Sequence, residues 1–270
     1  MAVLRSTTIR RPLPQRRFVR PVIGWAGVLV VALGWQLLAV ALNTSIFPTF
    51  ITTMQAVGTV LSGPALSQDV LPSVERALAG FAISAVLGVV VGLALGYYRR
   101  LGDYCATLVD FLRSLPTPLF VPLAIVLLGL GSQMVVAIVV SAAVWPVLLN
   151  AFDAARRVEP LHLDTARALG LRGVALFRRV LFPATLPSIV AGLRIALSTS
   201  LAVLIIAEIL GASSGLGYFI QDAQQTFEVP ETYAGVVILA ALGWLFDTLF
   251  LAAEHRWLRW DQATAGGNRV

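Results

Sequence analysis

The chain has 270 residues, of which 58% are hydrophobic and only 13% are charged, and its mean hydropathy is +0.84. A water-soluble domain carries about 25% charged residues, so this composition excludes one and indicates an all-α integral membrane protein. The formal net charge is +6, and all 20 basic residues are arginine. We attribute that balance to membrane topology rather than to nucleic-acid binding. Cys105 is the only cysteine, and the two histidines lack a metal-ligand pattern, so we expect neither an intrachain disulfide nor a metal site.

Six segments are predicted to cross the membrane, because a spanning helix needs about 20 apolar residues. Residues 22–42 and 77–98 are uncharged runs of this length. The uncharged stretch 114–152 would be roughly 58 Å long as one helix, so we expect two spans separated by the turn-forming residues 129–133. The predicted spans are 22–42, 77–98, 112–130, 133–152, 188–211 and 232–253.

The arginines predict the orientation of the chain. Six precede residue 21, Arg99 and Arg100 follow the second span, six lie between the fourth and fifth spans, and three follow the sixth. The other loops hold none, so the positive-inside rule places both termini in the cytoplasm. The first apolar run exceeds the 7–15 residues of a signal peptide, so we expect it to be retained as a span. The predicted parts are a basic cytoplasmic arm at 1–20, a transmembrane domain at 21–255 with a cytoplasmic loop at 153–187, and a cytoplasmic tail at 256–270.

The first half of the chain contains three further signals. An outer segment, 43–73, includes an apolar piece at 47–61 that can form a short interfacial helix. Arg76 lies at the outer end of the second span, where its neighbour Glu75 can offset its charge. Small residues recur at every fourth position of this span, which allows close packing against neighbouring helices: Gly80, Ser84, Gly88, Gly92 and Gly96.

Prolines open the third span at Pro116, Pro118 and Pro122. Prolines free backbone carbonyls and bend membrane helices. Broken helices often line transport paths, but prolines also make plain packing kinks, so both interpretations of Pro122 stay open.

Glu208 and Asp247 lie within the fifth and sixth spans. An acid at the centre of a span costs about 2.5–3.5 kcal/mol on insertion scales, so each should face the bundle or a cavity. Each is either a gate or pathway group or a carboxylate that holds helices together. Arg194 lies roughly 21 Å from Glu208 along the helix and cannot pair with it. Hydroxyl partners are expected instead, at Ser198, Thr199, Ser200, Ser213 and Ser214.

Two polar regions flank the fifth span. After it, the dense glycines at 211–217 predict a helix end with unusual backbone conformations on the outer side, and Gly215 and Gly217 are further pathway candidates. Before it, the long loop is predicted to form a helix at 160–168, a break at Gly170 and an amphipathic piece at 174–181. The prolines that follow, Pro183 and Pro187, are expected to close the loop. An ordinary membrane-surface loop remains the alternative.

This loop resembles the EAA motif of ABC importer permeases, E-A-A, three residues, G, nine residues, I, one residue, L-P. The matching positions, which the resemblance implies as contacts with an ATPase, are Asp164, Thr165, Ala166, Leu169, Gly170, Val180 and Pro183. Asp replaces the first Glu, Thr the middle Ala, Val the Ile and Phe the Leu. Further stretches resemble the nitrate, sulfonate, taurine and bicarbonate type of permease, at 112–116, 121–123, 129–131, 207–208, 215–218, 243–247 and 254–260.

The resemblance implies a type I ABC importer-like permease fold with a cytoplasmic coupling helix, in a bacterial inner membrane. It further implies a homodimer of permease subunits, a cytoplasmic ATPase dimer that binds ATP and magnesium, and an extracytoplasmic solute-binding protein. The chain has no lysine, which a P-loop requires, so we expect no ATPase site and no cofactor on this chain. The alternative is a proton-coupled secondary transporter that uses Glu208 or Asp247, although no internal repeat supports it.

Overall fold

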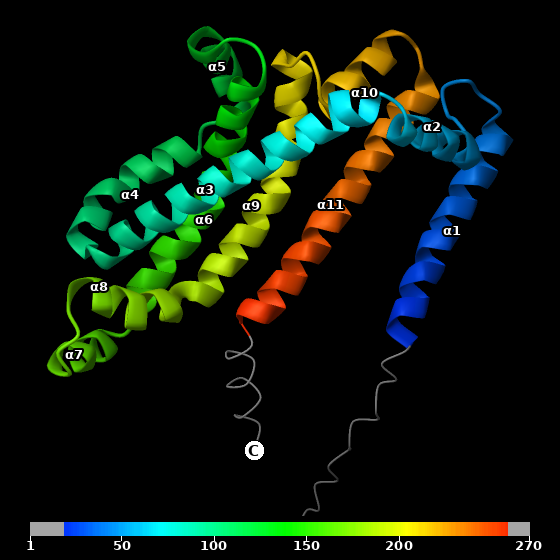
Figure 1. Cartoon of the computed structure of the whole chain (residues 1–270). Coiled ribbons are helices and arrows are strands. Elements are labelled where there is room, and N and C mark those ends of the chain that lie inside the picture. Colours follow the sequence, from blue (N-terminus) through cyan, green and yellow to red (C-terminus); the bar gives the residue numbers. More distant parts are fainter. Residues whose placement is uncertain (1–18, 259–270) are drawn as a thin grey trace, which may run out of the picture.

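The computed structural model describes residues 19–258, with side chains from Ala26 onward, and this part of the chain is entirely helical apart from turns and loops. The predicted arm at 1–20 and tail at 256–270 therefore lie almost wholly outside the described residues. The helices are α1 (Val19–Leu42), α2 (Phe50–Ser62), α3 (Leu71–Tyr97), α4 (Arg99–Arg113), α5 (Phe120–Leu128), α6 (Ser132–Arg157), α7 (Pro160–Ala168), α8 (Gly173–Leu176), α9 (Phe182–Gly211), α10 (Leu216–Gln225) and α11 (Val229–Trp257) (Figure 1).

Four helical segments among the described residues are long and apolar enough to cross a membrane: Leu66–Tyr97, Ser132–Arg157, Gly173–Gly211 and Val229–Trp257. The described part of α1 adds a shorter apolar helix, Ala26–Leu42. A count of six spans remains a prediction. The short helix expected within 47–61 is confirmed as α2, and its interfacial position stays a prediction, whereas α10 forms in a region that was predicted to be a loop.

The third predicted span, 112–130, is not one straight helix. The amphipathic α4 and the apolar segment Thr117–Leu128 are bent by 80° relative to each other. Pro116 has an extended backbone at the bend, with φ −61° and ψ 123°, and a short 3-10 turn at Thr117–Leu119 leads into α5. The predicted span thus corresponds mainly to this turn and α5, and the prolines separate it from α4, for which the sequence made no prediction.

The predicted cytoplasmic loop at 153–187 is shorter than expected. The chain remains helical to Arg157 on one side, and on the other it is helical from Gly173 through a π-turn at Phe177–Leu181 into α9. Pro183 lies in the first turn of α9 and Pro187 inside it, so these prolines do not close the loop. The helical path bends where α8 leads into α9 (Figure 1), as helices do at prolines and π-turns.

The core is built on α3, α6 and α9. Parallel helices α3 and α6 pack along the predicted small-residue stripe, where Gly88 faces Val147 and Gly96 faces Ala155. This close approach confirms the interpretation of the stripe. The antiparallel α9 also packs along α6, with Gly192 against Pro146 and Asn150, and α11 contacts α9 more sparingly. We call the end of this bundle that holds α7 the inner end and the end that holds α10 and α2 the outer end (Figure 1).

Candidate functional site

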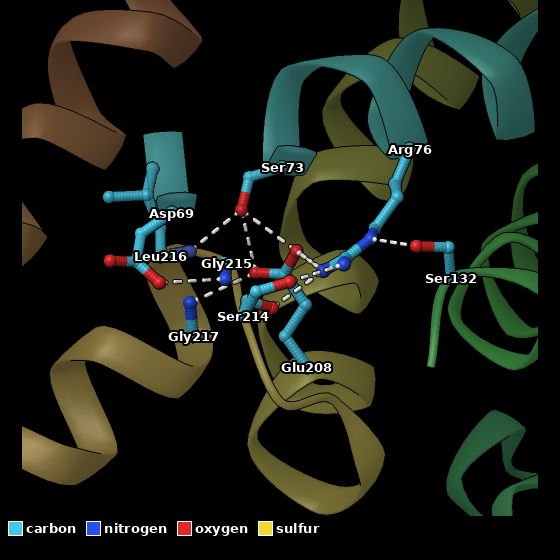
Figure 2. Close-up of polar contacts among 9 residues, drawn as sticks. All are labelled: Asp69, Ser73, Arg76, Ser132, Glu208, Ser214, Gly215, Leu216 and Gly217. Carbon is cyan, nitrogen blue, oxygen red and sulfur yellow. Dashed lines mark hydrogen bonds and ion pairs between the residues drawn. The ribbon is translucent and has the colours of Figure 1, made fainter. Parts of the chain in front are cut away.

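A buried network, here called the outer polar cluster, joins α3 to the turn between α9 and α10 (Figure 2). Its side chains come from Asp69, Ser73, Arg76, Ser132, Ser214 and Glu208. Because the π-turn at Leu66–Val70 continues directly into α3, Asp69, Ser73 and Arg76 lie at spacings of four and three residues on one helical path. That path faces the end of α9.

Glu208 is the centre of this cluster and has no exposed surface. Its Oε1 accepts hydrogen bonds from Ser73 Oγ at 2.8 Å and from Arg76 Nη1 at 2.9 Å. Its Oε2 lies 2.8 Å from the same Ser73 hydroxyl and accepts a bond from the Gly217 backbone N–H at 2.9 Å. Both oxygens of the carboxylate are therefore satisfied by protein groups.

Arg76 is almost as deeply buried, with 6% of its surface exposed. Besides the ion pair with Glu208, it donates to Ser214 O at 2.7 Å, to Ser214 Oγ at 2.8 Å and to Ser132 Oγ at 3.0 Å. The expectation that Glu75 offsets this arginine is wrong, because the counter-charge is Glu208, 132 residues further along the chain.

The hydroxyl partners expected for Glu208 are also corrected. Three of them instead donate within α9 to the backbone of the preceding turn, a common arrangement for Ser and Thr in helices: Ser198, Thr199 and Ser200. Of the five, Ser214 joins the cluster, but it binds Arg76 rather than Glu208. The hydroxyl that does bind Glu208 is that of Ser73.

The same side chains cap the start of α10. Its first free backbone N–H groups, at Gly215, Leu216 and Gly217, donate to Asp69 Oδ1 at 3.0 Å, Ser73 Oγ at 2.7 Å and Glu208 Oε2 at 2.9 Å. Carboxylates at a helix N-terminus are favourable because they meet its positive end. Gly215 has a φ of +118°, and a Cβ at this residue would collide with the Glu208 carboxylate. The glycines thus allow the turn to close over the carboxylate.

This geometry favours the interpretation of Glu208 as a carboxylate that holds helices together over its interpretation as a gate or pathway group. A carboxylate with no exposed surface and four bonding contacts has no open path to water in this structure, which a proton relay needs. What the arrangement does is fasten α10 to α3 and α9. Gly215 and Gly217 belong to this fastening, whereas Pro122 lies exposed in the first turn of α5.

Asp247 has a different environment. It pairs with Arg194, whose Nε lies 3.1 Å from Asp247 Oδ1 and whose Nη2 lies 3.4 Å from Oδ2. The pair links α9 to α11, and both side chains are a little under half exposed in the single chain. Polar groups of this kind do not face lipid tails. The pair therefore marks a surface that faces water or protein.

At the inner end, α7 confirms the helix predicted at 160–168. Gly170 ends it in a left-handed conformation, with φ +84°, and Leu171 N–H bonds back to Ala166 O at 3.0 Å. This is the Schellman type of helix end. A Cβ on Gly170 would meet no atom within 4 Å, so its role here is conformational. Ala166 is only 5% exposed, so its small side chain packs within this chain and does not itself offer a contact surface.

The segment 160–176, which holds α7 and α8 and is here called the inner projection, has a partly apolar exposed surface. Leu161, Leu169 and Val174 are 69%, 78% and 80% exposed, and Asp164 pairs with Arg167 at 2.9 Å. The hydrogen bond from Arg167 to Tyr97 and, to a lesser extent, the one to Asp164 raise the pKa of that guanidinium above its ordinary value. Thr165 is exposed, Val180 half-buried in the π-turn and Pro183 half-buried in α9. Large apolar side chains exposed together indicate an interaction surface.

Comparisons with known proteins agree with this architecture. Residues 84–257 match the family described as "Binding-protein-dependent transport system inner membrane component". A permease protein of Escherichia coli (strain K12) named for aliphatic sulfonates transport is 31% identical over 252 residues, which is 93% of this chain and 96% of that protein. The bicarbonate transport system permease protein of Synechococcus elongatus (strain ATCC 33912 / PCC 7942 / FACHB-805) is 33% identical over 189 residues, 70% of this chain and 68% of that protein.

Among solved structures, a chain of the MetNI methionine ABC transporter in an inward-facing conformation superposes with a TM-score of 0.58 and 22% sequence identity. The superposition covers 68% of this chain and 94% of that one, and it shows a common fold. The matched family region includes α7, Glu208 and Asp247 but not Ser73 or Arg76. The chain belongs to the family of binding-protein-dependent transport system inner membrane components, the multi-pass permeases of ABC transporters.

Proposed function

We propose that this chain is the permease subunit of an ATP-driven importer that moves a small solute by alternating access. In this proposal α7 is the coupling helix that docks on a separate ATPase, and the inner end of the bundle faces the cytoplasm with both termini. The observation that carries the proposal is the inner projection itself. It presents Leu161, Leu169 and Val174 to solvent, and apolar side chains exposed in this way are typical of a surface that binds a partner.

The connection from α7 to the membrane supports the mechanism. The chain is helical without interruption from Gly173 to Gly211, so the segment that follows α7 runs through the bundle to its outer end. Its bend is packed into the core, where Leu176, Leu181 and Thr185 are buried. At the far end Glu208 fastens the same helix to α10 and α3. A displacement of α7 by a docked ATPase is therefore passed on to the outer end.

Membership of the family supports the remaining components of the proposal. We propose two permease copies, an ATPase dimer that carries ATP and magnesium, and an extracytoplasmic binding protein that delivers the solute. Two relatives are named for the transport of aliphatic sulfonates and of bicarbonate, which are small anions. We propose a solute of this class for the present chain. Binding-protein selectivity then sets which one is carried.

Proton-coupled transport through Glu208 has less support, because this carboxylate is fully buried and both of its oxygens accept hydrogen bonds from protein groups. Asp247 is the more accessible acid, but it is held by Arg194. Glu208→Gln separates the two mechanisms. ATP-driven uptake survives it in part if the residue is structural, whereas a proton relay loses all uptake.

Docking of the ATPase is tested by co-purification. Leu161→Arg with Leu169→Arg replaces the exposed apolar surface of α7 by charge, and we expect the ATPase to be lost from the purified complex. The matched control is Phe227→Arg, which makes the same kind of change at an 88% exposed residue between α10 and α11. If the ATPase stays bound to the double variant as it does to the control, α7 is not the docking element.

A further inference from the structure

A cavity at the inner end gathers positive charge beside α7. It has a volume of about 660 Å³ and opens between the α3–α4 turn and α7. The residues that matter for its chemistry are Tyr97, Tyr98, Arg99, Arg100, Asp164 and Arg167. Three guanidinium groups and two phenol rings thus surround one open space that holds a single carboxylate.

The positive charge of this cavity is not neutralised by the described part of the chain. Asp164 is matched by Arg167 at 2.9 Å. Arg99 and Arg100 meet no carboxylate within ion-pair distance among residues 26–258, and Arg99 donates only a long bond of 3.4 Å, to Arg156 O. Both lie in the first turn of α4, a turn without an acidic residue, and Asp103 in the next turn pairs with Arg156. The two guanidinium groups repel each other and the partial positive charge of the helix N-terminus. An anion bound between them would offset this repulsion.

The surroundings of the cavity indicate what kind of anion this is. It lies where the 27-residue α3 ends, at the level at which tyrosine and arginine meet lipid head groups. Along α4 after Arg100, the helix exposes Leu101, Tyr104 and Leu108, which are 48%, 85% and 57% exposed and follow one another at helical spacing. A phosphate group in the cavity would have an apolar strip next to it. A free anion would make no contact with that strip, whereas the acyl chains of a lipid would pack against it.

We propose that this cavity binds the head group of an anionic phospholipid, with Arg99 and Arg100 on its phosphate and the acyl chains along α4. Basic pockets between membrane helices on the cytoplasmic side are suited to such head groups. Because Arg167 of α7 lines the same cavity, the lipid ties α7 to the membrane surface. The site itself needs only a membrane location for the chain, so it stands whether or not α7 docks an ATPase.

The test measures lipid binding to the purified full-length chain by native mass spectrometry, with phosphatidylglycerol and, for comparison, phosphatidylcholine of the same acyl chains. Arg99→Gln with Arg100→Gln should weaken the affinity for the first bound phosphatidylglycerol molecule by about tenfold or more. The preference of the protein for phosphatidylglycerol over phosphatidylcholine should be lost. Arg99→Lys with Arg100→Lys keeps the charge and should retain the preference, which shows that the fold is intact. The matched control is Arg178→Gln with Arg179→Gln, another exposed arginine pair at the inner end that does not line the cavity.

The other outcomes overturn the proposal in distinguishable ways. Equal losses in both glutamine variants would mean diffuse attraction to the surface. Displacement of the lipid by inorganic phosphate would mean a free-anion site, and unchanged binding in all variants would place the lipid elsewhere. If the Arg99 and Arg100 variant keeps its lipid but loses a co-purified ATPase, the cavity receives carboxylates of a protein partner instead.

Discussion

Arg76 and Glu208 neutralise each other in a site that excludes water, so they depend on each other more than on any other group. Removing one partner leaves a buried charge, which typically costs about 3–5 kcal/mol, whereas replacing both by apolar residues of similar size is often nearly neutral. We therefore expect Arg76→Met and Glu208→Leu each to destabilise the protein strongly and the double variant to be more stable than either. Thermal unfolding in detergent micelles measures this cycle. Additive losses would show that the pair is not a unit.

Gly170 allows a test of a single backbone conformation. Its φ of +84° lies in the left-handed region, and there is open space around it, so Gly170→Ala changes only the backbone preference. The cost for a residue with a Cβ is about 1–2 kcal/mol. Amide exchange of the last turn of α7 should be faster in Gly170→Ala and largely restored in Gly170→Asn, because asparagine tolerates this conformation. Identical exchange in alanine and asparagine variants would contradict this account.

At the scale of elements, the Arg194–Asp247 pair is the polar link between α9 and α11. Asp247→Asn leaves Arg194 without its counter-charge within a membrane helix, where ionisable side chains depend on a partner. We expect a lower yield of folded protein and slower uptake. The exchanged pair, Arg194→Asp with Asp247→Arg, should recover part of both. Recovery of yield without uptake would assign the pair to folding alone, and no recovery of either would contradict the pairing.

The elements also show what a sequence can predict. Helices with strong periodicity or length were found, including α2, α6, α7 and α11. The end of α5 was also found, from the turn-forming residues at 129–133, but α4 was not predicted, because it is amphipathic and hydropathy registers only apolar runs. The glycines at 211–217 predicted a break but concealed α10, whose first turn depends on caps supplied by α3.

The site could be predicted only in part for a related reason. Glu208 was identified from its cost in a membrane, but its partners lie 132 and 135 residues away, and nothing local to Ser73 or Arg76 points to them. The sequence placed Arg76 at the outer end of its span and Glu208 near the middle of another, whereas Glu208 lies in the last turn of α9, where the two side chains meet. The inner projection was easier, because its helix, break and exposed arginines are consecutive in the chain.

On the scale of the whole molecule, the helical path from Gly173 to Gly211 connects the inner projection to the outer polar cluster. If it transmits movement, its stiffness matters. Ala184 and Ala191 are exposed on α9, so replacing both by glycine removes few contacts but weakens the helix by about 1 kcal/mol at each position. We expect ATP hydrolysis by the assembled transporter to continue while the outer end no longer responds to it.

The response is measured at Tyr218 of α10, which is 37% exposed. With Cys105 replaced by alanine, Tyr218→Cys reports the outer end through its rate of maleimide labelling, with and without ATP. In the parent the two rates should differ, and in the Ala184→Gly, Ala191→Gly variant they should converge. The control places glycine at Ala241 and Ala252, exposed residues of α11, which is not joined to α7. A difference in rates that persists in the α9 variant would mean that movement reaches the outer end by another route, such as the α3–α6 contact.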